Sequence, residues 1–166
     1  PLVAHVCGSW ARDVGEGKSM PIGVREFLLL FQGAQLNFAA QGEWSIGRSI
    51  EVKYVSAWVD FLIVQCRYFP GGVIDQELCY LFDRSGGRGE LPGEWTAPLK
   101  EARCGYAGGL NPENLAGELE RLSKVVGEDT IWIDVESGIR TNDRFDLEKA
   151  RRFLEIARPW VVPMKE

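Results

Sequence analysis

The decisive stretch of this 166-residue chain is residues 107–115, Ala-Gly-Gly-Leu-Asn-Pro-Glu-Asn-Leu. A strand-like segment, Cys104–Ala107, runs directly into Gly108 and Gly109, and Asn111 then stands where it can cap a helix. Glycine lets the backbone approach a ligand closely, and a helix N-terminus presents free N–H groups. This turn is therefore suited to binding an anion.

A second turn of the same kind follows at Ile131–Gly138, where the segment Ile-Trp-Ile-Asp-Val-Glu runs into Ser137 and Gly138. Two successive strand-to-glycine turns near the chain end are how the last two loops of a (β/α)8 barrel commonly hold a phosphate group.

Strands and helices are predicted to alternate along the chain. The strand candidates are Leu2–Cys7, Ala34–Phe38, Phe61–Arg67, Leu78–Asp83, Cys104–Ala107 and Thr130–Glu136, and the helix candidates are Val24–Phe31, Ser49–Trp58, Pro112–Val126 and Asp146–Arg158. In the third helix one apolar face is predicted, made of Leu115, Leu119, Leu122 and Val126. In the fourth, Asp146 is the predicted cap, and the predicted core side carries Leu147, Ala150, Phe153, Leu154 and Ala157. This alternation predicts an α/β protein, with a parallel sheet and outer helices, forming one domain over residues 1–166. Ligands of such folds bind beyond the carboxyl ends of the strands.

Composition narrows the class of protein. A hydrophobic fraction of 45% and a charged fraction of 26% are ordinary for a soluble globular protein, and a net charge of −5 argues against a nucleic-acid binder. The four cysteines form no C-x-x-C pair and there is one histidine, so a zinc site is not expected. No membrane span and no signal peptide are recognised, which predicts a cytoplasmic protein with reduced thiols.

The segment Asp83–Gly89, Asp-Arg-Ser-Gly-Gly-Arg-Gly, follows a predicted strand. Its three glycines and two arginines favour a ligand-binding loop, and a flexible surface loop is the alternative. As the last strand residue, Asp83 can serve as a general acid or base, or can only accept hydrogen bonds from the amides of the loop.

Asp134 and Glu136 lie two residues apart on a strand and so share one face, whereas Ile131, Ile133 and Val135 take the other. Two carboxylates in a barrel mouth need hydrogen bonds, water or a cationic partner, and the alternative for Glu136 is a solvated position beyond the sheet. His5 is interpreted as a structural histidine, although imidazole is the side chain that ordinarily titrates nearest neutral pH.

The candidate site residues all fall at predicted carboxyl ends of strands. Asp83 and Asp134 are the catalytic candidates, and the ligand- or phosphate-binding candidates are Asn37, Arg67, Gly86, Gly87, Arg88, Gly108, Gly109, Ser137, Gly138 and Arg140.

These motifs resemble those of the phosphoribosylanthranilate isomerase family. Residues 81–89 with the later Trp95 look like its strand-six segment, residues 107–114 like its strand-seven loop and residues 133–138 like its strand-eight loop. Residues 35–37, Gln-Leu-Asn, are similar to the Gln-Leu-His of its strand four. The resemblance is good from about Leu78 to Ala157 and thin before that.

The resemblance implies a (β/α)8 barrel that rearranges an aminoaldose to a ketose without metal or cofactor. It implies that Asp83 is the general acid and that Asp134 contacts the substrate. It also implies that the phosphate sits on the loops that match Gly108–Gly109 and Ser137–Gly138.

Two departures from the family pattern stand out. The family's general base is a cysteine at the end of strand one, three β/α units before strand four, or about 90 residues. Cys7 lies only 28 residues before Gln35, so it ends the equivalent of strand three, and strands one and two are not visible. Glu136 stands where the family has a small residue; its charge would repel a phosphate unless Arg140, Arg88 or Arg67 compensates.

Six strands do not close an eight-stranded barrel. Either an N-terminal β/α pair lies outside this sequence, or the open sheet edge is covered by a partner chain or by a rearranged segment, and a shortened chain that associates as a homodimer is the favoured interpretation. Three functions follow as hypotheses. The first is an isomerase-like protein that acts on a phosphorylated sugar or nucleotide-like molecule. The second is a non-catalytic binding or sequestering protein for a phosphorylated nucleotide or metabolite. The third is a barrel remnant that serves as an assembly surface.

Overall fold

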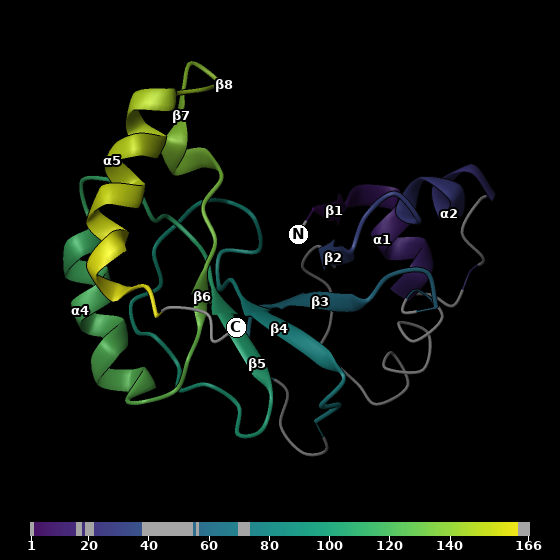
Figure 1. Ribbon diagram of the computed structural model, residues 1–166, viewed down its shortest axis with the longest axis horizontal. Coiled ribbons are helices and arrows are strands. Elements are labelled where there is room, and N and C mark those ends of the chain that lie inside the picture. The colour runs from purple at the N-terminus through teal and green to yellow at the C-terminus, as the bar shows by residue number, and fades with distance from the viewer. Residues whose placement is uncertain are drawn as a thin grey trace.

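The computed structural model describes residues 2–15, 18, 22–37, 55, 57–69 and 74–162. Within them lies one six-stranded parallel sheet in which each strand pairs with the next along the chain. Its strands are β1 (Val3–Val6), β2 (Gly33–Asn37), β3 (Phe61–Cys66), β4 (Leu78–Phe82), β5 (Arg103–Tyr106) and β6 (Trp132–Ile133). The predicted α/β class with six strand positions is confirmed, as an incomplete, curled barrel-like sheet (Figure 1).

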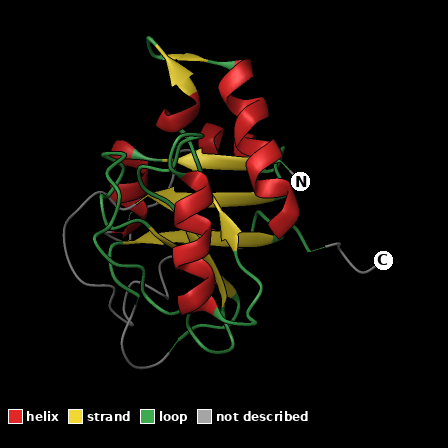
Figure 2. Cartoon of the chain, turned by 90° about the vertical axis from the view of Figure 1, so that its left-hand side faces the viewer, coloured by secondary structure: helices red, strands yellow, loops and turns green. Residues whose placement is uncertain are grey.

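Among the described residues, helices follow β1, β5 and β6 on the outer side of the sheet. They are α1 (Gly8–Gly15), α2 (Ile22–Leu28), α4 (Leu115–Val126) and α5 (Leu147–Ala157), with short 3₁₀ turns η1 (Ser137–Ile139) and η2 (Arg158–Trp160) and a small hairpin of β7 (Arg140–Thr141) and β8 (Arg144–Phe145). Figure 2 shows α4 and α5 lying in front of the strands. The predicted helix Ser49–Trp58 falls largely outside the described residues.

The amphipathic pattern predicted for α4 is confirmed, because Leu115, Leu119, Leu122 and Val126 are all buried. They pack in one core cluster with Phe82, Trp95 and Tyr106. A second cluster joins β1, β2 and β3 to α1 and α2. A third, smaller cluster consists of Ile63, Cys79, Leu81 and Ala107.

The apolar face predicted for α5 is only partly correct. Phe153 is buried, but the exposed fractions of Leu147 and Leu154 are 75% and 67%. Asp146 does cap the helix, since its carboxylate accepts the Lys149 N–H at 3.1 Å. The capping prediction was right, whereas the two leucines were wrongly assigned to the core because the helix packs along a narrower stripe than the pattern indicated.

The sheet ladder extends one residue beyond three of the strands, at the carboxyl edge. The Asp83 N–H donates to the Cys66 carbonyl at 2.9 Å, that of Ala107 to Phe82 at 2.8 Å and that of Asp134 to Tyr106 at 2.9 Å. These bonds set both aspartates at the same edge of the sheet. The last strand is far shorter than the predicted Thr130–Glu136, because only Trp132 and Ile133 pair with β5.

Candidate functional site

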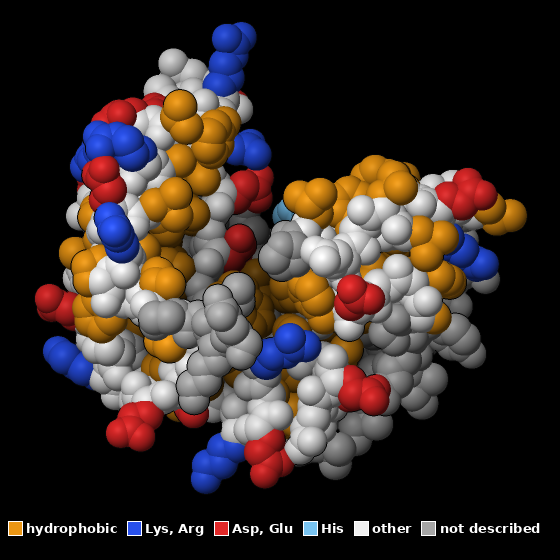
Figure 3. Space-filling view, viewed as in Figure 1, with side chains coloured by type: hydrophobic (Ala, Val, Ile, Leu, Met, Phe, Trp, Pro, Cys, Tyr) orange, Lys and Arg blue, Asp and Glu red, His pale blue; other side chains and the backbone are white. Residues whose placement is uncertain are grey.

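A cavity of about 130 Å³ lies at the carboxyl edge of the sheet. Figure 3 shows a hollow between the half that carries α1 and α2 and the half that carries α4 and α5. The cavity is lined by His5, Gln35, Asn37, Gln65, Leu81, Asp83, Gly87, Gly89, Ala107, Gly108, Gly109, Leu110, Asp134, Val135, Glu136 and Ser137. The structure therefore brings together seven candidates from the sequence: Asn37, Asp83, Gly87, Gly108, Gly109, Asp134 and Ser137.

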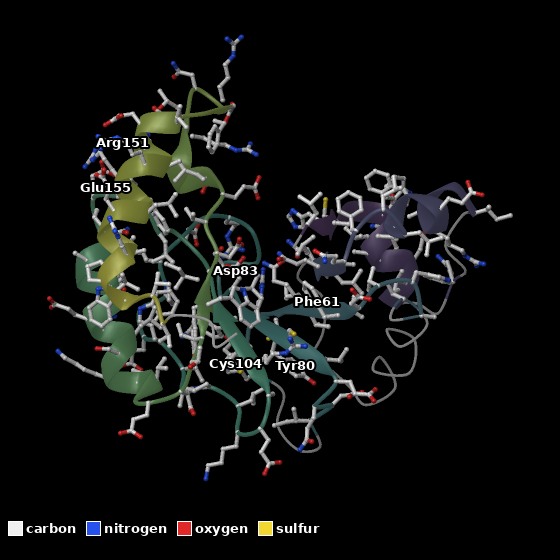
Figure 4. The ribbon with its side chains drawn as sticks, viewed as in Figure 1. Phe61, Tyr80, Asp83, Cys104, Arg151 and Glu155 are labelled. Atoms are coloured by element: carbon white, nitrogen blue, oxygen red, sulfur yellow. The ribbon has the colours of Figure 1, made fainter. Side chains whose placement is uncertain are left out.

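Asp83 is 5% exposed and both of its carboxylate oxygens are engaged. Oδ1 accepts the Ser85 N–H at 3.0 Å and the Ser85 hydroxyl at 2.7 Å. Oδ2 accepts the Gly87 N–H at 2.7 Å and a hydrogen bond from Gln65 Nε2. Both predicted roles are thus compatible, because the carboxylate holds the amides of its own loop and also faces the cavity (Figure 4).

Glycine is required where the loop after Asp83 turns. Gly86, Gly87 and Gly89 have φ angles of 63°, 87° and 69°, a region that other residues enter at a cost of about 1–2 kcal/mol. A Cβ atom at Gly86 would lie 2.8 Å from Arg67 Nε, so the Arg67 guanidinium rests against the outside of this turn.

Arg67 and Arg88 do not line the inner cavity. With Arg84 they line a neighbouring open cavity of about 760 Å³ on the other side of the same loop. Arg88 pairs there with Glu90 at 3.3 Å, and the Arg84 guanidinium lies over the Tyr68 ring, 5.6 Å from its centre. The loop thus separates a small cavity beside Asp83 from a larger cavity lined by three arginines.

The Gly108–Gly109 turn is built to bring main chains together. Its φ angles are 108° and 65°, and a Cβ atom at Gly109 would lie 2.5 Å from the Leu91 nitrogen. A Cβ atom at Gly108 would lie 3.1 Å from Asp83 Oδ1. Neither glycine N–H has an acceptor among the described residues, so both are available to a ligand.

Two asparagines fix this turn, and they correct the predicted start of the helix. The structure begins α4 at Leu115 instead of Pro112. Asn114 Nδ2 donates to the Gly109 carbonyl at 2.9 Å, and Asn114 Oδ1 accepts the Asn111 N–H at 2.9 Å. Asn111 Oδ1 in turn accepts the N–H groups of Glu113 and Asn114. The capping bonds expected of Asn111 therefore form in a turn before the helix.

The second turn packs on the first. Gly138 lies so close to the Leu110 carbonyl that a Cβ atom there would overlap it, and a Cβ atom at Gly89 would lie 2.7 Å from Ser137 Oγ. The N–H groups of Ser137 and Gly138, like those of the first turn, have no acceptor within the described ranges. Gly138 itself is not among the residues that line the cavity.

Asp134 is the carboxyl group whose ionisation the cavity changes most clearly. Burial raises the pKa of Asp134, the positive field of His5 opposes this, and the neighbouring charges of Glu136 and Asp83 add to it. Glu136 forms an ion pair with Arg140 at 2.9 Å, with exposed side-chain fractions of 62% and 44%. The pair supports the expectation that Arg140 compensates Glu136, and the high exposure fits the solvated alternative.

The sequence missed three side chains of the cavity. His5, expected to be structural, is exposed and lines the cavity, so that expectation is wrong. Gln65 binds Asp83, and Gln35 Nε2 donates to Asn37 Oδ1 at 3.0 Å. Gln65 was the available signal, because it is a polar residue in an otherwise apolar strand and stands one residue before the end of β3.

The connection between β4 and β5 crosses the Gly108–Gly109 turn and is anchored to α4. The Trp95 indole N–H donates to Glu118 at 2.8 Å, and the buried Glu118 carboxylate pairs with Arg121 at 2.9 Å. Arg121 also donates to the Gly93 carbonyl at 2.6 Å. Trp95 packs edge-on against Tyr106, with ring centres 5.8 Å apart. The position of this connection therefore depends on α4.

Comparison with known proteins identifies the family of the chain. Residues 73–156 match the family described as N-(5'phosphoribosyl)anthranilate (PRA) isomerase. The chain is 39% identical to the N-(5'-phosphoribosyl)anthranilate isomerase of Zygosaccharomyces bailii over 170 residues, which covers 93% of this chain and 76% of that protein.

The protein of the same name from Desulfitobacterium hafniense (strain Y51) is 38% identical over 85 residues, which covers 45% of this chain and 33% of that protein. No solved structure is significantly similar. The chain belongs to the N-(5'-phosphoribosyl)anthranilate isomerase family.

Proposed function

We propose that the chain binds a phosphorylated aminoaldose in the inner cavity and rearranges it to a ketose, with Asp83 as general acid. The observation that carries this proposal is the meeting of two glycine turns and one buried carboxylate around a single cavity. The relatives are named as isomerases of N-(5'-phosphoribosyl)anthranilate, and this molecule is the natural first substrate to test.

The phosphate is assigned to the closing turns. Gly108, Gly109, Ser137 and Gly138 offer N–H groups that have no acceptor in the described part of the chain, and the two turns touch through Gly138 and Leu110. Converging backbone N–H groups stabilise phosphate oxygens without a metal ion. The charge of Glu136 at the rim is offset by Arg140.

The sugar is assigned to the polar side chains deeper in the cavity. Asp134 accepts from sugar hydroxyls, and the Gln35–Asn37 pair provides further donors and acceptors. Asp83 stands at the end of the neighbouring strand, oriented by Ser85, Gly87 and Gln65. A carboxyl group fixed in this way can deliver a proton to a ring oxygen placed between the turns and β4.

A non-catalytic binding or sequestering role is the second candidate. One observation favours it: Cys7, which matches the family's Cys-Gly base motif by local sequence, does not line the cavity. No cysteine is therefore in place as the base among the described residues.

The four cysteines are free, which suits a reducing compartment and supports a cytoplasmic location.

The test is to assay Asp83→Asn with N-(5'-phosphoribosyl)anthranilate while measuring ribose 5-phosphate binding by calorimetry. We expect turnover to fall by about 10²–10⁴-fold, because a general acid is lost, while the affinity for ribose 5-phosphate changes little. Asp129→Asn, at an exposed aspartate after α4, is the matched control and should behave as wild type. Binding without turnover in the wild-type chain would instead support the sequestering role.

A further inference from the structure

The connections on either side of β4 differ from the others in the described part of the chain. The connection from β1 to β2 carries α1 and α2, and that from β5 to β6 carries α4. The connection from β4 to β5, residues 83–102, holds turns and extended chain only (Figure 1). Together with Arg67 and Tyr68, which follow β3, it lines the arginine-lined cavity of about 760 Å³. A cavity of this volume accommodates a small organic molecule.

Arg67 brings to this cavity a charge that no described residue compensates. Its guanidinium forms no hydrogen bond or ion pair within the described ranges, and Nε is buried without an acceptor. Packing alone holds the side chain, since a Cβ atom at Gly86 would lie 2.8 Å from Nε and 2.9 Å from Nη2. A buried charged donor without a partner costs free energy, which an anion in the cavity would offset.

Arg84 supplies a second guanidinium to the same cavity. It lies over the Tyr68 ring, 5.6 Å from the ring centre. A cation–π contact of this kind restrains the guanidinium without using its N–H donors. Those donors have no acceptor in the part of the chain that the structure describes. Arg67 and Arg84 therefore present two sets of free N–H groups to one cavity.

The remaining charges of the lining leave this excess in place. They are Arg88, Glu90 and Glu94, all exposed. Arg88 pairs with Glu90 at 3.3 Å, so these two charges largely cancel, and Glu94 stands against Arg67 and Arg84. The whole chain has a net charge of −5, so its overall field does not attract anions. An anion bound here would be held by the local arginines.

We propose that the arginine-lined cavity is a second binding site, for a small polyanion that carries phosphate or carboxylate groups. The planar guanidinium bonds two oxygens of either group at once. Tyr68 and Leu91, which are 65% and 40% exposed, offer an apolar surface to the rest of the ligand. The site uses neither Asp83 nor the two glycine turns, so the inference stands independently of the proposed function.

The first experiment locates the site. The ¹⁵N-labelled full chain is titrated with inorganic pyrophosphate and, separately, with citrate, while the side-chain Nε–H signals of Arg67 and Arg84 are followed by NMR. We expect saturable shifts of both signals. A stronger response to pyrophosphate identifies a phosphorylated ligand, and a stronger response to citrate identifies a polycarboxylate. Shifts confined to the amides of Gly108 and Gly109 would place the anion in the inner cavity and overturn the inference, as would the absence of saturation.

The second experiment measures affinity by calorimetry with the same two probes. Arg84→Gln should weaken binding by about 10- to 100-fold, because charge-assisted hydrogen bonds are lost at an exposed position where the fold does not depend on them. Arg67→Lys should weaken it too, since lysine keeps the charge but lacks the planar fork. Arg12→Gln, at an exposed arginine of α1, is the control of equal charge change and should bind as wild type. Equal losses in Arg84→Gln and Arg12→Gln would reduce the effect to overall charge and refute the site.

Discussion

Ionisation of Asp134 lowers the stability of the folded chain. Its raised pKa means that the folded state disfavours the ionised form, so its contribution to stability is lost as the pH rises through the folded-state pKa. Asp134→Asn should therefore unfold at higher urea concentration than wild type at pH 7, and the difference should vanish as the pH falls towards 3. Urea titrations across this pH range measure it, and a less stable variant at pH 7 would contradict the assignment.

An added methyl group at Gly109 is expected to destabilise the fold. Its φ of 65° and the backbone 2.5 Å from a Cβ atom there predict that Gly109→Ala destabilises the fold by at least about 1–2 kcal/mol and weakens phosphate binding. Gly117→Ala is the control, because Gly117 is exposed within α4 with nothing near its Cβ position. That change should stabilise the protein by about 0.5–1 kcal/mol in the same thermal and chemical unfolding assays.

The connection between β4 and β5 is held in place by α4. Glu118→Ala leaves the Trp95 indole N–H without its acceptor and removes the partner of Arg121, which predicts a loss of about 1–3 kcal/mol. Because the connection packs on Gly109, phosphate affinity should fall too. Glu120→Ala, exposed on the same helix, should change the unfolding free energy by less than about 0.5 kcal/mol. Equal effects of the two substitutions would contradict the anchoring role.

Elements with a strong local signal were predictable from the sequence. The buried face of α4 follows from leucines at helical spacing, and Asp146 is a capping residue by type and position. Tertiary packing decided the rest. β6 pairs with β5 over two residues, Trp132 with Gly105 and Ile133 with Tyr106, and no sequence pattern in Thr130–Glu136 carries that information.

At the scale of the whole molecule, the sheet has two open edges among the described residues, at β1 and β6. Unpaired parallel edges expose backbone donors and acceptors, so we propose that the chain associates with a second copy through β1. Leu2, at the start of this edge, is 71% exposed. Leu2→Lys should shift sedimentation profiles towards the monomer, since an edge lysine opposes strand pairing. Leu147→Lys, at an equally exposed leucine of α5, should have no effect.

Much of the candidate site could be predicted because parallel strands end at one edge of a sheet. This rule placed Asp83, Asp134 and the two glycine turns together without any knowledge of distances. It could not tell which side of a loop each residue faces, and so Arg67 and Arg88 were grouped with residues of the inner cavity. The curl that brings His5 and Asp134 to one cavity is a property of the entire sheet and cannot be read from the residues next to either of them in sequence.

The segment between Asp83 and Gly89 lies between the inner cavity and the larger arginine-lined cavity, and this matters for anyone who re-engineers the protein. A substitution made to enlarge the arginine-lined cavity changes the loop that contains Gly87, whose amide donates to the Asp83 carboxylate. Ligand selectivity in the arginine-lined cavity and proton transfer by Asp83 in the inner cavity therefore depend on the same loop. Libraries that randomise Arg84 or Arg88 should accordingly be screened for both traits at once.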